Sequence, residues 1–118
     1  MKMKFKKVSL WGITILFCVT NLYAQSPDTL WTKTFGGMED DEGFDVKQTS
    51  DGGYIIVGYT ESFGVGPRNV YLIKTYANGN TQWTRTYGGT DTDYGFSVQQ
   101  NSDGGYIIAG WTSSFGAD

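Results

Sequence analysis

An internal repeat limits the possible folds of this 118-residue chain more than any other feature. Residues 31–66 align with residues 83–118 at a spacing of 52, and 22 of the 36 aligned pairs are identical. The longest identical run is Ser50–Ile56, which matches Ser102–Ile108. Self-similarity over this length indicates one supersecondary unit that is present more than once.

Each repeat is predicted to contain four β-strands. Residues 43–49 alternate apolar and polar side chains, which is typical of a strand with one covered face. Residues 54–60 are almost all apolar or aromatic, so this strand is expected inside its sheet with both faces covered. Two further strands are predicted at residues 70–76 and 82–87, and residues 25–118 contain no window with helical periodicity.

Glycine-containing turns separate these strands. The run Ser50-Asp51-Gly52-Gly53 and its copy Ser102-Asp103-Gly104-Gly105 predict hairpin turns, in which Asp51 and Asp103 accept hydrogen bonds from backbone N–H groups. Asn78-Gly79 is the residue pair most typical of a two-residue hairpin loop. Gly36-Gly37 and Gly88-Gly89 are interpreted as turn glycines, because no helix follows to bind a phosphate.

Four antiparallel strands that recur about every 50 residues describe the blade of a β-propeller. We therefore predict an all-β fold of propeller blades: a leader at 25–30, a first blade at 31–82 and a truncated second blade at 83–118. Propellers close with roughly four to eight blades. We expect an N-terminal piece of a longer protein with further blades in cis; assembly of several complete chains into one ring is the alternative.

Residues 1–24 have the three parts of a secretory signal peptide. They carry Lys2, Lys4, Lys6 and Lys7, then a short apolar run from Val8 to Val19, and end on Ala24. The run is shorter than the roughly 20 residues of a spanning helix, so a retained membrane anchor is the weaker alternative. A lipoprotein is weaker still, because the bulky Phe17 precedes Cys18. The predicted location is secreted or cell-surface.

The chain that remains after residue 24 is acidic, with five Lys and Arg against twelve Asp and Glu, a formal charge of −7. This charge disfavours nucleic acid and anionic membranes as partners. The whole chain has no His, and its single Cys lies in the predicted signal peptide. These counts exclude His- or Cys-based catalytic systems and thiolate or imidazole metal sites from this segment. We predict no catalytic residue, no cofactor-binding residue and no metal ligand.

The motifs together resemble a group of secreted bacterial and archaeal β-propeller-like repeat proteins. The resemblance rests on Trp31–Gly37, Asp51–Thr60, Tyr71–Thr75 and Asn78–Asn80, and it covers residues 31–118. Repeats in that group are often followed by a sorting domain for export to the cell surface, as in type IX secretion. The resemblance implies a propeller and a surface location, and it implies no enzyme activity.

The densest acidic cluster is Glu39-Asp40-Asp41-Glu42, with Asp45 nearby and a counterpart at Asp91-Thr92-Asp93. Hard cations such as calcium bind carboxylate oxygens, but the cluster lacks the ligand spacing of an EF-hand loop. A solvated loop that protects strand edges is the favoured interpretation. Glycosidic-bond hydrolysis by two carboxylates is the remaining alternative, and nothing in the sequence sets two of these acids at the required separation.

Large aromatic residues recur at one or two positions in each repeat. These side chains are interpreted as packing between blades, with sugar stacking as the alternative; they are Trp31, Tyr59, Trp83 and Trp111. Loop Glu61–Asn69 is the most variable stretch and the expected place for ligand recognition. The predicted function is a non-catalytic binding or structural module for a protein or glycan partner. A propeller-based glycosidase or lyase with its active residues outside this segment is the competing hypothesis.

Overall fold

The computed structural model describes residues 3–9 and 28–116, and each regular element in these ranges is a β-strand. In chain order the strands are β1 (Met3–Ser9), β2 (Asp28–Phe35), β3 (Asp41–Gln48), β4 (Tyr54–Thr60), β5 (Asn69–Thr75), β6 (Thr81–Tyr87), β7 (Asp93–Gln100) and β8 (Tyr106–Thr112). The prediction of an all-β fold is confirmed. Across these residues no helix has the length and hydropathy to cross a membrane.

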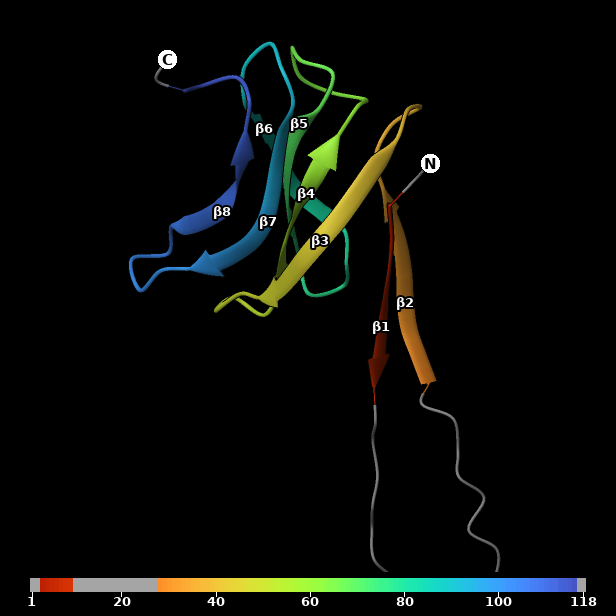
Figure 1. The fold of residues 1–118 in the computed structure, drawn as a ribbon. Helices are drawn as coiled ribbons and strands as arrows, with labels where there is room; N and C mark the ends of the chain where they lie inside the picture. The colour runs from red at the N-terminus through yellow and green to blue at the C-terminus, as the bar shows by residue number, and fades with distance from the viewer. Residues whose placement is uncertain (1–2, 10–27, 117–118) are drawn as a thin grey trace, which may run out of the picture.

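Three antiparallel sheets make up the described structure (Figure 1). The central sheet has four strands in the order β3-β4-β5-β6, so each strand pairs with its neighbour in the sequence. Strands β1 and β2 form a second sheet, and β7 and β8 form a third. Loops between consecutive strands therefore alternate between the two ends of the central sheet.

The predicted strands agree closely with the observed ones. Strand β4 has the predicted bounds, lies between β3 and β5, and is buried from Ile55 to Thr60. Strand β3 begins two residues earlier than predicted, at Asp41. The Asn78-Gly79 hairpin is present, with Gly79 at a φ of 80° and the Tyr76 N–H donating to the Asn80 carbonyl at 2.9 Å.

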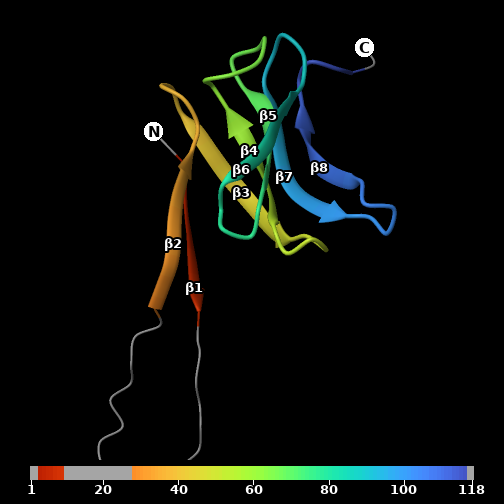
Figure 2. The ribbon, with the colours of Figure 1, turned by 180° about the vertical axis from the view of Figure 1, so that it is seen from behind.

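The core lies on both faces of the central sheet. On one face, Ile55, Val57 and Leu72 pack against Val98 of β7. On the other face, Ile56, Tyr71 and Ile73 pack against Phe35 of β2. Figures 1 and 2 show the β7–β8 sheet on one side of the central sheet and the β1–β2 sheet on the other. The sheets bury their apolar faces by stacking, which is the usual arrangement of layered β-structures.

Positions 52 residues apart make matching contacts. Trp31 of β2 meets Tyr54 of β4 edge-on with ring centroids 5.8 Å apart, and Trp83 of β6 meets Tyr106 of β8 at 5.9 Å. Pairing of β3 with β4 shifts register after Gly43, and pairing of β7 with β8 shifts after Gly95. Each sheet is thus stacked on the next through the same residue types.

Part of the predicted signal peptide forms a strand. Residues 3–9 make up β1, which pairs antiparallel with β2 from Met3 opposite Phe35 to Ser9 opposite Asp28. Residues 10–24 lie outside the described part of the chain. Removal of residues 1–24 as a signal peptide remains a prediction.

Two glycines at matching positions have different surroundings. A Cβ atom on Gly53 would lie 2.0 Å from the Thr75 carbonyl oxygen, at the end of β5. On Gly105, 52 residues later, a Cβ atom would meet only the side chain of Asp103, at 3.2 Å. Close backbone approach therefore requires glycine at position 53, whereas the described residues impose no such requirement at position 105.

This difference gives a first prediction. Gly53→Ala should lower the free energy of unfolding by about 2 kcal/mol or more, because the methyl group forces β5 away from the turn. Gly105→Ala should cost less than about 1 kcal/mol. Urea denaturation followed by tryptophan fluorescence measures both, and equal losses would contradict the described contact.

Candidate functional site

Four loop segments gather at one end of the sheets, here called the rim. They are residues 36–40 between β2 and β3, 61–68 between β4 and β5, 88–92 between β6 and β7, and 113–116 after β8. Figure 1 shows the last three together at the top of the molecule. The rim includes loop Glu61–Asn69, which the sequence favours for ligand recognition.

A buried aspartate holds the rim loops together in each repeat. Asp41 accepts hydrogen bonds from the Gly37 N–H at 2.8 Å and from the Ser62 hydroxyl at 2.8 Å. Asp93 accepts the matching bonds from Gly89 at 3.0 Å and from Ser114 at 2.7 Å. The Ser62 and Ser114 hydroxyls also accept backbone N–H groups, from Glu39 and Asp91. Each carboxylate thus ties two loops to one another.

The interpretation of the acidic runs as solvated loops is wrong for these two residues. Asp41 is only 3% exposed and Asp93 only 1% exposed. Burial alone would raise the pKa of Asp93, but hydrogen bonds from the Thr112 and Ser114 hydroxyls lower it. Buried carboxylates with several donors are structural groups here. Glu39, Asp40 and Glu42 remain exposed, as expected.

Arg68 joins the β4–β5 loop to the next sheet. Its Nε donates to Glu61 Oε1 at 2.6 Å, and its Nη1 donates to the hydroxyl of Tyr94 on β7. The guanidinium also lies 4.9 Å from the ring centroid of Tyr59. A planar cation that stacks and donates in two directions fixes the orientation of the loop.

Asn69 is the second connection between these loops. It is 1% exposed, accepts from the Gly66 N–H at 3.0 Å and donates to the Gly89 carbonyl at 3.2 Å. Its own backbone opens β5 and pairs with Thr60. One amide side chain therefore closes the β4–β5 loop and joins it to the β6–β7 loop.

The rim displays apolar side chains to solvent although its backbone is tied down. Met38 is 96% exposed and Val65 is 76% exposed, and Phe63 and Phe115 are also exposed. Phe63 is anchored by ring contact with Tyr71, with centroids 5.6 Å apart. Loops held in place by a rigid scaffold carry a disproportionate share of binding residues.

The carboxylates in the part of the chain that the structure describes are not grouped as metal ligands. Among residues 3–9 and 28–116 there is no group of three or more His, Cys, Asp or Glu side chains placed to hold a metal ion. The Asp41 and Asp93 carboxylates are already bonded to loop donors. Calcium binding by the acidic loops stays an untested alternative.

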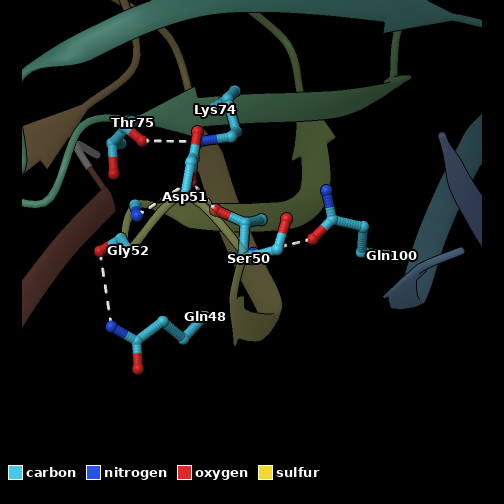
Figure 3. A network of polar contacts seen from close by, with 9 residues as sticks. Gln48, Ser50, Asp51, Gly52, Lys74, Thr75 and Gln100 are labelled. Atoms are coloured by element: carbon cyan, nitrogen blue, oxygen red, sulfur yellow. Dashed lines mark hydrogen bonds and ion pairs between the residues drawn. The ribbon is translucent and has the colours of Figure 1, made fainter. Parts of the chain in front are cut away.

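A second polar network lies at the end opposite the rim, around the β3–β4 turn (Figure 3). Lys74 is only 3% exposed, and its ammonium donates to Asp51 Oδ2 at 2.9 Å and to the Thr75 carbonyl at 2.8 Å. The Ser50 N–H donates to Gln100 of β7 at 2.9 Å. The network thus connects β5, the β3–β4 turn and the next sheet.

The predicted role of Asp51 and Asp103 in their turns is confirmed. Asp51 accepts the Gly53 N–H at 3.0 Å and Asp103 accepts the Gly105 N–H at 2.9 Å. Hydrogen bonds from the Thr49 hydroxyl and the Lys74 ammonium hold the pKa of Asp51 well below its ordinary range. The lysine partner of Asp51 was not predicted. Lys74 directly follows the apolar residues 70–73, but nothing near it in the sequence identifies Asp51 as its partner.

The candidate aromatic residues differ in exposure. Trp31 and Trp83 contact Tyr54 and Tyr106 of the adjacent sheets, as the packing interpretation expects. Tyr59 is buried against Tyr94 with centroids 5.2 Å apart. Trp111, the fourth candidate, contacts Tyr94 and is 51% exposed. Phe44 and Phe96, which the sequence did not single out, are both exposed beside the same Tyr94 ring.

Comparison with known proteins finds no family model that matches this chain and no curated protein of significant similarity. The functional assignment therefore depends on the residues and contacts described above.

The Asn69 contacts lead to a second prediction. Asn69→Ala should lower the free energy of unfolding by about 1–3 kcal/mol, because the buried amide is lost and the half-buried Gly66 N–H and Gly89 carbonyl lose their partner. Asn78→Ala, which removes one bond to the Asn80 N–H in an exposed turn, is the matched control and should cost less than about 1 kcal/mol. A loss that is as large in the control as at Asn69 would contradict the role given to Asn69.

The ion pair of Asp51 leads to a third prediction, about pH. The folded-state pKa of Asp51 lies below its unfolded value of about 3.9. The contribution of Asp51 to the free energy of unfolding is therefore complete above the unfolded pKa, and it is lost as the pH falls through the lower folded-state pKa. The urea concentration at the midpoint of unfolding, measured between pH 7 and pH 2, should therefore fall at the lowest pH values. Asp51→Asn should flatten this fall, while Asp91→Asn on the exposed rim should leave it unchanged.

Proposed function

We propose that this protein is a non-catalytic, secreted or cell-surface β-propeller repeat protein whose rim binds a protein or a glycan. In this proposal each four-stranded meander is a blade, and further blades complete the ring. The observation that carries the proposal is the rim, where buried Asp41 orders the loops that expose Met38, Phe63 and Val65. Buried Asp93 orders the loop that exposes Phe115 in the same way. Ordered loops lose little conformational entropy on binding, which favours recognition.

The stacking of the sheets supports the blade architecture. Four antiparallel strands in sequence order, covered on both faces by neighbouring sheets, are what a blade requires. Trp31 and Trp83 make the same kind of edge-on contact with a tyrosine of the next sheet, so the two pairs of neighbouring sheets pack in the same way. The resemblance of residues 31–118 to secreted propeller-like repeats points in the same direction.

The chemistry of the described residues supports binding over catalysis. The chain has no His, and the carboxylates of Asp41 and Asp93 are buried and bonded to backbone and hydroxyl donors. A glycosidase needs two carboxyl groups that face one another across the scissile bond. The competing hypothesis, a propeller-based glycosidase or lyase, therefore places its active residues outside this segment.

The predicted export can be tested directly. Expression of the full chain with a C-terminal tag in a secreting bacterial host should place the protein outside the cytoplasm, with an N-terminal sequence that starts at Gln25. A substitution of Leu16 by Arg in the apolar run of the signal should retain the protein inside. Export without cleavage would contradict the signal-peptide assignment.

The rim can be tested with a matched pair of variants, which gives the fourth prediction. The labelled chain is titrated onto a glycan array and onto washed cells of the producing strain. The double variant Met38→Asp with Val65→Asp should reduce saturable binding at least about tenfold, because it places charge among the exposed apolar side chains. Tyr76→Asp, an exposed aromatic at the opposite end, is the control.

Either of two results would overturn the rim assignment. One is binding that survives the double rim variant but is lost in the Tyr76→Asp control. The other is turnover of an array glycan by the chain, which would favour the enzyme hypothesis.

A further inference from the structure

The outer edge of β8 is one of the strand edges that have no partner among the described residues. Strand β4 pairs with β3 on one edge and with β5 on the other. Its counterpart β8 pairs with β7 along one edge, and no described strand pairs with the other. The side chains of β8 are more exposed than those of β4, and Ile107 is 62% exposed where Ile55 is fully buried.

An open apolar groove of about 540 Å³ lies beside this edge, between β8 and the central sheet. Tyr87 and Ile108 are among its lining residues. The matching positions one repeat earlier are Phe35 and Ile56, and these two enclose Tyr71 and Ile73 of β5. The groove therefore corresponds to the space that the β5 side chains fill in the first repeat.

Two further residues beside the edge match a β5 strand. Asp51 forms an ion pair with Lys74 of β5, whereas Asp103 has no ion-pair partner among the described residues. Gly53 is required by the carbonyl of Thr75 at the end of β5, whereas Gly105 has free space on that side. Asp103 therefore offers a carboxylate for a lysine, and Gly105 leaves space for a backbone carbonyl. An added strand of the β5 type would contact both.

We propose that the open edge of β8 binds one extended strand of the β5 sequence type, Asn-Val-Tyr-Leu-Ile-Lys-Thr. The inference rests on the proposed blade architecture and specifies the strand that this edge recognises. Strand addition to a free edge is an established mode of peptide recognition. The lysine of the strand reaches Asp103, and its tyrosine and isoleucine enter the groove beside Tyr87 and Ile108.

The first repeat also predicts the register of the added strand. In the central sheet Tyr54 lies opposite Thr75, Ile56 opposite Ile73 and Thr60 opposite Asn69. The same pairing on β8 places the peptide threonine opposite Tyr106 and the peptide asparagine opposite Thr112. Backbone amides of β8 that face the open edge should therefore gain protection from hydrogen exchange.

The test uses the full chain and a labelled synthetic peptide with the sequence of residues 69–75, extended by a flexible polar tail. Fluorescence anisotropy should give saturable binding for this peptide and none for a scrambled version. Gly105→Ala should weaken binding at least about tenfold, because the methyl group occupies the position of the incoming carbonyl. Gly116→Ala, with nothing near its Cβ position, is the matched control.

The charge is tested by a double-mutant cycle. Asp103→Asn keeps the acceptor for the Gly105 N–H but removes the charge, and it should weaken binding about fivefold. The Lys→Gln peptide should lose about the same, and the two changes together should cost no more than one alone. Additive losses would overturn the role of Asp103.

Four results would each overturn the proposal. They are absence of peptide binding, equal binding of the scrambled peptide, unchanged binding by Gly105→Ala, and protection that appears on a strand other than β8. None of these results would alter the export or rim measurements, because neither of those experiments depends on β8. Failure of the edge proposal is therefore distinguishable from failure of the proposed function.

Discussion

Strand β4 carries apolar side chains on both faces, and this burial requirement governs the rest of the structure. Ile55 and Val57 point to one side and Ile56 to the other, and each side is closed by a different neighbouring sheet. A single sheet would leave at least one of these faces in water, at a cost of roughly 25 cal/mol for each Å² of apolar surface. Stacking is therefore a condition of stability for this sequence, and the order of the layers follows the order of the chain.

The polar groups set the alignment of the layers, which apolar contact alone does not specify. At the rim, Asp41 and Asp93 join successive loops, and Asn69 and Arg68 connect one sheet to the next. At the opposite end, Lys74 and Asp51 hold β5 against the β3–β4 turn. Both ends of the stack are thus fixed by directional bonds, and the rim loops keep one arrangement while their apolar side chains face solvent.

Much of the local structure could be predicted from the sequence, because strands and turns depend on neighbouring residues. The apolar run of β4, the Asn78-Gly79 hairpin and the turn at Asp51 are of this kind. The burial of Asp41 and Lys74 could not be predicted, because each depends on a partner more than 20 residues away. The acidic run around Asp41 suggested a solvated loop, and the hydrogen bonds of Asp41 across the fold reverse that expectation. The apolar rim surface also required the fold, since its residues come from three separate loops.

The pairing of β1 with β2 gives the predicted signal peptide a structural effect. If cleavage follows Ala24, the mature chain loses β1, which is the described partner of β2. Cleavage would therefore change the strand pairing of β2, while the packing of its Phe35 on Ile56, Tyr71 and Ile73 of the central sheet involves no residue of β1.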